Sequence, residues 1–454
     1  MYRQYFLLLA ICLILVACAQ PDTPTPTPLP VTPTPFPTPQ SGTIVVDPEA
    51  SWGPISPYVL GSNYGPWVAV PVDMLPSAYE SGVKAIRFPG GAWGDRNNLK
   101  SYHIDPFIAF CEQVGAIPTI SVRLREATPE QAAALVRYVN IEKQYGVVYW
   151  SIGNEPTLFA AELQTLGKAD DYDTVQYNQE WRAFAEAMKA VDPTIKLMGP
   201  EIHQFNSNPD FNPKDSAGRD WMTEFLKANG DLVDVVTFHR YPFPKSREEP
   251  DVTIADLREQ SQEWSGTIIY LRELIQEITG RDIPIAITEV NTHYNQAVGG
   301  EATPDSHYNA IWLAELLGQM MVQDVFMVNH WMLTSKGGQG GWGLIGPGQE
   351  RPSYDTFQLF KQMGSEMIAA ASGVNNLSIY AAKRDDGALT LILVNRADEA
   401  QTATLQVQGV SLGQAELWQL DPEHRPEAGM SFTFPANGEI TLPGQSISLF
   451  IIQP

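Results

Sequence analysis

The chain has 454 residues, of which 44% are hydrophobic and 18% are charged. This composition is typical of a globular protein, and the length allows a barrel of about 250 residues together with a smaller domain. Fifty-two acidic and 29 basic residues give a formal net charge of −23, which would repel nucleic-acid phosphates and anionic membrane surfaces. We therefore expect no nucleic-acid partner.

The first 18 residues have the layout of an export signal. Arg3 supplies a positive charge, residues 6–17 form an unbroken apolar run, and Cys18 follows. This run is too short to span a bilayer but suits a secretory signal peptide. The small residues before Cys18 resemble the lipobox of bacterial lipoproteins, which implies cleavage before Cys18 and lipidation of its thiol. The expected location is extracytoplasmic, either anchored to the membrane only through this lipid or, as the alternative, secreted.

Residues 19–41 are rich in threonine and proline. Such a segment cannot bury a core and favours the extended polyproline II helix, so we predict a linker. Of the three cysteines, Cys12 lies in the signal and Cys18 is the predicted lipidation site, which leaves Cys111 and no internal disulfide. Cys111 follows apolar residues in a helix-like stretch, and we interpret it as a core residue.

Between residues 42 and 372, apolar strand-like segments alternate with helix-length amphipathic segments. Eight segments are candidate strands: residues 58–63, 83–88, 116–122, 147–152, 196–199, 233–239, 284–288 and 326–331. Helical patterns lie between them, for example at 129–145, 177–191 and 266–279. This alternation predicts repeated βα units, and eight units fit a closed parallel (β/α)8 TIM barrel better than an open sheet.

The pattern changes after residue 372. Residues 373–454 contain short alternating segments separated by turn signals, which predict an antiparallel β-sandwich domain. Residues 42–50 begin with a strand-like segment that we expect at an edge of this sandwich. The sandwich is expected to pack against the barrel, with carbohydrate binding as the alternative role. The predicted fold class is therefore α/β, a TIM barrel with a C-terminal antiparallel β-sandwich.

Two glutamates lie where a barrel places its active site. Glu155 follows the fourth predicted strand in an Asn-Glu-Pro sequence, and Glu289 ends the seventh. In a TIM barrel, the C-terminal ends of the strands and the loops after them form the active site. Hydrolysis of a glycosidic bond requires two carboxyl groups, one to protonate the leaving oxygen and one to attack or to activate water. The two glutamates therefore predict a glycosidase that acts on a poly- or oligosaccharide.

These motifs resemble clan A of the glycoside hydrolases, whose members have Asn-Glu at the end of the fourth strand and Glu at the end of the seventh. The resemblance covers roughly residues 50–450 and is nearest to families of β-xylosidases, α-L-arabinofuranosidases, endoglucanases and heparanase-like β-glucuronidases. It implies retention of configuration by double displacement, with Glu155 as acid/base and Glu289 as nucleophile. It also implies that Asn154 donates a hydrogen bond to the sugar 2-hydroxyl.

Further residues match the same clan. Arg87 ends the second strand before Pro-Gly-Gly, where an arginine of the clan bonds the nucleophile. His239 and Tyr241 end the sixth strand, and the resemblance implies that they orient the nucleophile and contact the sugar. Trp331 ends the eighth strand and matches the tryptophan that forms the floor beneath the sugar. Other candidate platforms lie on predicted loops: Trp67, Trp93 and Trp342.

Two expectations concern the details of this site. Like-charged carboxyl groups about 5 to 5.5 Å apart raise the pKa of one of them, so one glutamate is expected to be protonated near neutral pH. Arabinofuranosidase-like relatives often continue Pro-Gly-Gly with Asn, whereas Ala92 follows here. Asp95 and Asn97 are possible replacements for this amide. The departure weakens an assignment to arabinofuranosides.

The sequence contains no motif for metal or cofactor chemistry. No H-E-x-x-H, paired C-x-x-C or Walker motif occurs, and the seven histidines are scattered, so we expect neither a metal nor a cofactor. One alternative function is a non-catalytic surface protein that binds polysaccharide, although retention of both glutamates argues against it. A transglycosylase with the same residues is a second alternative. Endo and exo action are both open, and the sequence predicts no oligomeric state.

Overall fold

The computed structural model describes residues 38–165, 171–243, 252–336, 340–427 and 429–454. The predicted signal peptide with Cys18, and residues 19–37 of the predicted linker, lie outside this part of the chain. All described residues belong to one structural unit, residues 36–454. Among these described residues, no helix is both long and apolar enough to cross a bilayer.

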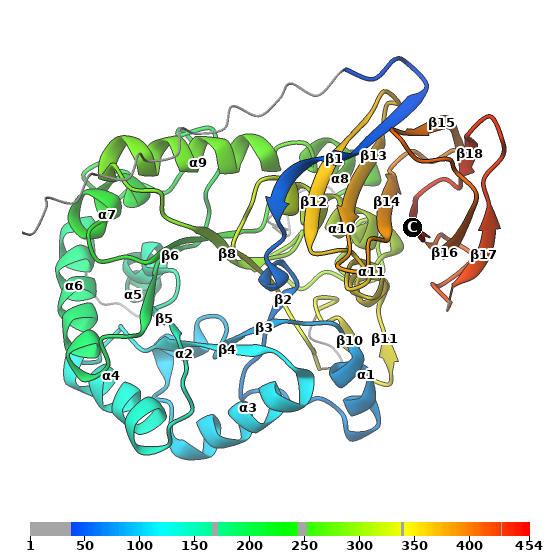
Figure 1. Cartoon of the computed structure of the whole chain (residues 1–454). Helices are drawn as coiled ribbons and strands as arrows, with labels where there is room; N and C mark the ends of the chain where they lie inside the picture. Colours follow the sequence, from blue (N-terminus) through cyan, green and yellow to red (C-terminus); the bar gives the residue numbers. More distant parts are fainter. Residues whose placement is uncertain (1–37, 166–170, 244–251, 337–339, 428) are drawn as a thin grey trace, which may run out of the picture. The chain divides into compact units, whose positions relative to one another are not determined.

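Eight parallel strands form a closed barrel (Figure 1). They are β2 (Gly61–Asn63), β3 (Ala85–Phe88), β4 (Ile117–Val122), β5 (Tyr149–Ile152), β6 (Lys196–Ile202), β7 (Val235–Arg240), β8 (Ile285–Val290) and β9 (Met327–His330). Each strand overlaps a predicted one, and the parallel pairing of β2 with β9 closes the barrel. The predicted TIM barrel is therefore confirmed.

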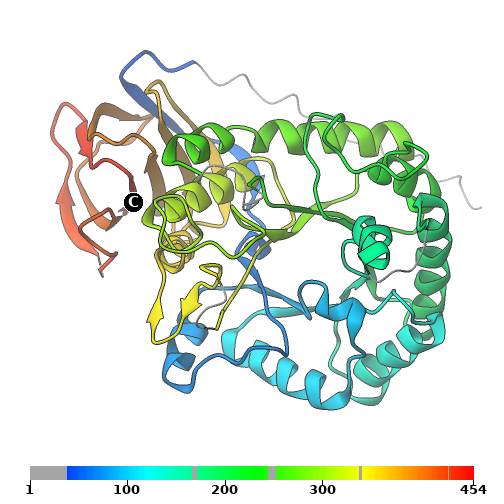
Figure 2. The same ribbon diagram turned by 180° about the vertical axis from the view of Figure 1, so that it is seen from behind.

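Helices surround the barrel in Figures 1 and 2. The α-helices are α1 (Leu75–Glu80), α2 (Trp93–Arg96), α3 (Ser101–Val114), α4 (Pro129–Val136), α5 (Phe159–Thr165), α6 (Thr174–Val191), α7 (Trp221–Asn229), α8 (Ile254–Gln260), α9 (Trp264–Thr279), α10 (His307–Val322) and α11 (Pro352–Phe360). Short helical segments are η1 (Pro57–Val59), η2 (Val72–Met74), η3 (Arg137–Glu142) and η4 (Pro156–Leu158). Helix α6 illustrates why they form, because Tyr177, Trp181 and Phe184 recur at helical spacing on its buried face.

The C-terminal domain is a nine-stranded sheet in the order β17-β16-β19-β14-β13-β12-β1-β15-β18. Its strands are β1 (Thr43–Pro54), β12 (Glu366–Ser372), β13 (Leu377–Lys383), β14 (Leu389–Asn395), β15 (Gln401–Val407), β16 (Gln414–Leu420), β17 (Met430–Thr433), β18 (Glu439–Leu442) and β19 (Ser446–Ile452). Leu417 and Leu442, from opposite ends of this order, belong to one hydrophobic core, so the sheet curls around that core. A two-stranded sheet, β10 (Ile345–Gly346) with β11 (Gln349–Glu350), lies between the two domains in sequence.

Two details of the predicted domain organisation differ from the structure. Strand β1 pairs antiparallel with β12 and parallel with β15, so it lies inside the sheet and not at an edge. Strand β12 begins at Glu366, so the sheet starts before the predicted boundary at residue 373. The run Ala-Ala-Ala in β12 lacks the β-branched and aromatic residues that mark strands, and the partners of β1 are distant in sequence. Neither feature is therefore visible in the local pattern.

Helix α10 joins the sheet to the barrel. Nearly all of its residues are buried, because it contacts β13, β14 and β19 on one side and other helices on the other. Gly318 is required at this contact, since a Cβ atom there would overlap the ring of Tyr380. Arg258 of α8 adds a polar contact by donating to Asp398 Oδ1 at 2.7 Å. The sheet is thus packed against the helical layer of the barrel.

Candidate active site

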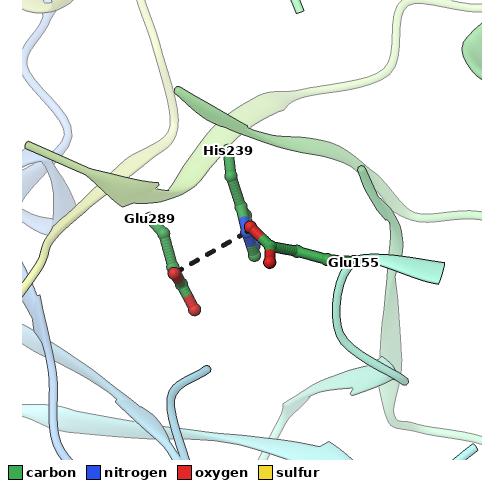
Figure 3. Close-up of side chains that lie close together, drawn as sticks. All are labelled: Glu155, His239 and Glu289. Carbon is green, nitrogen blue, oxygen red and sulfur yellow. Dashed lines mark hydrogen bonds and ion pairs between the residues drawn. The ribbon is translucent and has the colours of Figure 1, made fainter. Parts of the chain in front are cut away.

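The two predicted glutamates lie close together at the C-terminal ends of β5 and β8 (Figure 3). Glu289 lies within β8, and Glu155 comes just after β5. One carboxylate oxygen of each and one ring nitrogen of His239 all lie within 4.8 Å of one another. The side chain of Glu289 is 5% exposed, whereas that of Glu155 is 19% exposed. The structure thus brings together two carboxyl groups that are 134 residues apart in sequence (289 minus 155).

The loop after β5 holds Glu155 in an uncommon backbone conformation. Its φ is 49°, in the left-handed region where residues other than glycine are strained. The Glu155 N–H donates to the carbonyl oxygen of Glu201 at 2.9 Å. The N–H of the preceding Asn154 donates to Asp95 Oδ2 at 2.6 Å. These two hydrogen bonds fix the path of the chain where Glu155 leaves the strand.

Asp95, a candidate replacement for the missing substrate-binding amide, makes internal contacts instead. It is only 3% exposed, and its Oδ1 accepts hydrogen bonds from the N–H groups of Leu124 and Arg125 at 2.9 and 3.3 Å. Burial raises the pKa of Asp95 to about 6, although these N–H groups and that of Asn154 oppose the shift. Asp95, which follows β3, is therefore hydrogen-bonded to the loops after β4 and β5, and it holds the backbone of Asn154 in place.

Three donors hold the carboxylate of Glu289. Arg87 Nη1 donates to Oε1 at 2.7 Å, and the backbone N–H of Gly91 donates to the same oxygen at 2.8 Å. The hydroxyl of Tyr241 donates to Oε2 at 2.8 Å. Gly91 has a φ of +63°, and a Cβ atom there would lie 2.6 Å from the ring of Trp331, so this position requires glycine. These contacts fix Glu289 in one orientation.

Arg87 is the central cation of the site. It is completely buried, and besides Glu289 it donates to Asn63 Oδ1 at 3.0 Å, Asn154 Oδ1 at 2.9 Å and Glu201 Oε2 at 3.1 Å. Burial alone would lower the pKa of Arg87, but the carboxylates of Glu201 and Glu289 raise it above its usual value. The guanidinium therefore stays charged and balances part of the negative charge around it.

A third carboxylate, Glu201, was not predicted. Strand β6 extends to Ile202, three residues beyond the predicted end, so Glu201 lies inside the barrel. It is fully buried, and its Oε2 accepts a hydrogen bond from Thr288 Oγ1 at 2.7 Å and lies 2.8 Å from His239 Nε2. Burial would raise its pKa, but the charge of Arg87 and the bonds from His239 and Thr288 lower it to about 2. The lowered pKa therefore favours a negatively charged Glu201 at neutral pH.

His239 lies between the three carboxylates. Its Nδ1 is 2.9 Å from Glu155 Oε1 and 3.8 Å from Glu289 Oε2, and its Nε2 faces Glu201. Burial would lower the pKa of His239, but the charge of Glu289 and the bonds to Glu155 and Glu201 raise it to about 9. At neutral pH the ring is therefore an imidazolium that donates from both nitrogens.

The pKa of Glu155 differs from the expectation based on the sequence. Burial alone would raise it, but the hydrogen bond and the positive charge of His239 lower it below the usual value. The expected rise in pKa is therefore wrong for Glu155, because the expectation left out the cation of His239 beside it. The raised pKa of His239 favours a proton on this ring, one hydrogen bond away from Glu155.

Asn154 and Trp331, which were predicted to contact the sugar, belong to the same region. Asn154 Oδ1 accepts a hydrogen bond from Arg87, while its Nδ2 is buried and has no hydrogen-bond partner among the described residues. Trp331 follows β9, where its N–H donates to Val290 O at 2.9 Å and its carbonyl oxygen accepts a bond from Asn291 Nδ2 at 2.6 Å. The residues predicted from the clan resemblance, which are Arg87, Asn154, His239, Tyr241 and Trp331, therefore lie at the end of the barrel that holds both glutamates.

The donor set favours acid–base chemistry over metal binding. Among the described residues, one group of side chains is close enough to hold a metal ion, and it is the same trio of Glu155, His239 and Glu289. Arg87 already donates to Glu289, and a protonated His239 offers a hydrogen-bond donor in place of a lone pair. The positive charges of Arg87 and protonated His239 also repel a metal cation.

A closed (β/α)8 barrel with a C-terminal β-domain and glutamates at the ends of its fourth and seventh strands is the arrangement of clan A of the glycoside hydrolases. Solved structures share this fold. The α-L-arabinofuranosidase of Thermotoga maritima has a TM-score of 0.70 at 19% identity, and the comparison covers 91% of this chain and 100% of that chain. A family 44 xyloglucanase of Paenibacillus polymyxa has a TM-score of 0.68 at 15% identity, with 91% and 100% covered.

Residues 135–407, which include both glutamates, match Glycosyl hydrolases family 39, and the chain belongs to this family. A β-xylosidase of Geobacillus stearothermophilus is 24% identical over 286 residues, which are 57% of this chain and 49% of that protein. An intracellular exo-α-(1→5)-L-arabinofuranosidase of Streptomyces lividans is 24% identical over 217 residues, 38% of this chain and 30% of that protein. The chain thus spans about half or less of the length of these relatives.

Proposed function

We propose that the protein is a glycoside hydrolase that cleaves O-glycosidic bonds of an oligo- or polysaccharide with retention of configuration. The supporting observation is that an oxygen of Glu155 and an oxygen of Glu289 lie within 4.8 Å of each other. Retaining glycosidases hold their two carboxyl groups about 5 to 5.5 Å apart, whereas inverting ones need about 6.5 to 9.5 Å to admit a water molecule. Membership of family 39 supports the same class of reaction.

In the first step, Glu289 attacks the anomeric carbon while Glu155 protonates the leaving oxygen. A bond forms between a Glu289 oxygen and the anomeric carbon, and the glycosidic carbon–oxygen bond breaks, which gives a glycosyl ester and a free alcohol. Arg87, Gly91 and Tyr241 hold the attacking carboxylate in place, so little reorganisation is needed. The unpartnered Nδ2 of Asn154 is the donor assigned to the sugar 2-hydroxyl.

The proton for the leaving oxygen is stored on His239. Its Nδ1 lies 2.9 Å from Glu155 Oε1, so the proton passes to the carboxylate as the leaving oxygen takes up charge. Glu201 accepts the hydrogen bond from Nε2 and thereby keeps Nδ1 directed at Glu155. His239 and Glu201 are therefore positioning residues that act through Glu155.

In the second step, Glu155 accepts a proton from water, and the hydroxide attacks the anomeric carbon and releases Glu289. Esterification has by then removed the charge of Glu289, whose Oε2 lies 3.8 Å from His239 Nδ1 in the free protein. Loss of this charge lowers the pKa of His239. The unprotonated state of the His239–Glu155 pair, which general base catalysis by Glu155 requires, is therefore favoured. A sugar hydroxyl in place of water would give transglycosylation with the same residues.

A covalent trap tests this proposal. The protein is incubated with activated 2-deoxy-2-fluoro aryl glycosides of xylose, glucose and arabinofuranose, which slow the second step more than the release of the activated phenol. For the sugar that the enzyme accepts, we expect the protein mass to increase by one fluorosugar and the modified peptide to contain Glu289. A label on another residue, or turnover of the parent glycoside without any label, would contradict double displacement through Glu289.

The proposed place of action is outside the cytoplasm. The basic residue, apolar run and Cys18 at the N-terminus support export and lipidation of Cys18. Labelling of cells with radioactive palmitate should tag the protein but not its Cys18→Ala variant. Equal labelling of both forms would exclude Cys18 as the lipid attachment site.

A further inference from the structure

A continuous row of aromatic rings leads away from the catalytic glutamates. We define the aromatic row as Trp331, Trp67, Trp93, His103 and Tyr102. Successive ring centroids lie 6.1, 6.4, 5.3 and 4.2 Å apart in that order. The first four side chains are partly exposed, and Tyr102 is 71% exposed. The row therefore extends from the sugar-binding floor of the site to the solvent.

The inner end of the aromatic row is joined to the nucleophile. A Cβ atom added to Gly91 would lie 2.6 Å from the Trp331 ring, and the N–H of the same Gly91 donates to Glu289 at 2.8 Å. Trp67 follows β2, and residues 93–103 follow β3, so the rest of the row lies on loops at the C-terminal end of the barrel. The row and the two glutamates therefore share one face of the barrel.

The rings of the row contact one another and are reached by solvent. Trp67 is stacked on Trp331, with an angle of 28° between the planes, and is tilted by 39° to Trp93, whereas His103 meets Trp93 and Tyr102 edge to face. Each of the five side chains is at least partly exposed, so a ligand can reach the row from the solvent. The spacing between neighbouring rings is similar to the length of one pyranose residue in a glycan chain.

We propose that the aromatic row is a binding track for a neutral polysaccharide whose backbone consists of β-1,4-linked pyranoses, of the xylan or glucan type. This inference rests on the proposed function, because the track ends at the proposed catalytic site. Pyranoses with equatorial substituents present flat C–H faces that pack on aromatic rings, whereas furanoses are puckered and lack such a face. The net charge of −23 disfavours acidic polysaccharides by repulsion.

A polar hollow away from the aromatic row is another place where a sugar could bind, and it supplies a control variant for the tests of the row. It has a volume of about 650 Å³ and is formed by barrel helices and the C-terminal sheet, with Trp52 of β1 among its lining residues. Trp52 is 37% exposed and lies outside the aromatic row. A Trp52→Ala variant therefore removes an exposed indole without altering the row.

The first test measures hydrolysis as a function of chain length. The probes are soluble arabinoxylan and hydroxyethylcellulose as polymers, and p-nitrophenyl β-xyloside and β-glucoside as short substrates. In Tyr102→Ala and Trp93→Ala, the ratio of kcat/KM on the better polymer to kcat/KM on the matching aryl glycoside should fall about five- to tenfold, as expected for loss of one stacking contact. The same ratio should be unchanged in Trp52→Ala. A ratio that falls only in Trp52→Ala, or in none of the variants, would overturn the track.

The second test measures binding without turnover, so that failure of the track and failure of the proposed function are distinguishable. The Glu289→Ala protein is run on native gels that contain one of the two polymers. We expect one polymer to retard its migration and expect Tyr102→Ala, added to the same protein, to weaken the retardation. Absence of retardation by both polymers would overturn the track even if aryl glycosides are hydrolysed. Retardation that depends on Tyr102 would support the track even if the protein hydrolyses nothing.

Discussion

Glu155 and Glu289 are the same residue type at the same end of one barrel, yet their surroundings differ. Glu289 has a side chain that is 5% exposed and accepts hydrogen bonds from Arg87, Gly91 and Tyr241. Glu155 follows its strand in a left-handed conformation, has a side chain that is 19% exposed, and faces the imidazolium of His239. The difference shows how one barrel fixes a nucleophile in place while leaving its partner free to exchange a proton.

The largest effect is expected from removal of the fixed carboxylate. In Glu289→Ala, turnover should fall by more than about 10⁴-fold on every substrate, because no other group occupies the position of attack. Steady-state hydrolysis of aryl glycosides measures this loss. Glu277→Ala, which removes an exposed glutamate from α9, is the matched control and should keep full activity. A Glu289→Ala protein with more than a few per cent of the parent rate would show that another residue is the nucleophile.

The second effect depends on the leaving group. In Glu155→Ala, hydrolysis of glycosides with poor leaving groups should fall by about 10²- to 10⁴-fold, because the alcohol then departs without a general acid. Activated aryl glycosides should lose much less in the first step, since their phenolates leave without protonation. Comparison of dinitrophenyl and alkyl glycosides of one sugar measures this difference. Equal losses on both substrates would count against Glu155 as the acid/base.

The charge balance behind the fixed carboxylate can be tested through stability. Arg87→Met leaves Glu201 and Glu289 buried without their shared cation, and we expect a loss of about 3–5 kcal/mol in the free energy of unfolding. Urea titration measures it. Arg96→Met is the control, because the side chain of Arg96 is 60% exposed in its pair with Glu162 and should contribute less than about 1 kcal/mol. Similar losses in both variants would contradict the role of Arg87.

The smallest predicted effect concerns the proton store. His239 donates a hydrogen bond to Glu155. Glu289 and Arg87 lie on the nucleophile side of the ring. Tyr241 and His203 are the other titratable groups nearby. The shared proton is lost as the pH rises through the pKa of His239, which is about 9, so activity should decline above that value. In Glu201→Gln, the negative charge beside Nε2 disappears, the pKa of His239 falls, and the basic limb of the kcat/KM profile should move down by about one pH unit.

Glu201→Asp keeps the charge and should restore most of the parent profile. An unshifted limb in Glu201→Gln would show that Glu201 serves stability alone.

The sequence predicted the parts of the molecule that depend on local pattern. Apolar segments of strand length revealed the barrel, and a charged residue directly after such a segment identified Glu155 and Glu289. Glu201 was missed because the expected strand ended at Gly199, whereas pairing with β7 continues the strand to Ile202. The pKa of Glu155 was mispredicted for a related reason, since it depends on His239 of β7, Arg87 of β3 and His203, which follows β6.

The position of β1 in the sheet is a second example of a feature set by distant residues. Its own sequence predicts a strand but not the neighbours, which are β12 and β15, more than 300 residues later in the chain. Pairing over such a separation depends on the packing of the whole sheet around its core. The local sequence therefore determines that β1 is a strand, whereas the fold determines that it is internal.

The most direct test of double displacement is the anomeric configuration of the product at the moment of release. Proton NMR of an aryl glycoside hydrolysed at high enzyme concentration resolves the first-formed sugar before mutarotation. Two successive displacements predict a product with the configuration of the substrate. Accumulation of the opposite anomer would contradict covalent attack by Glu289, whatever the distances in the site.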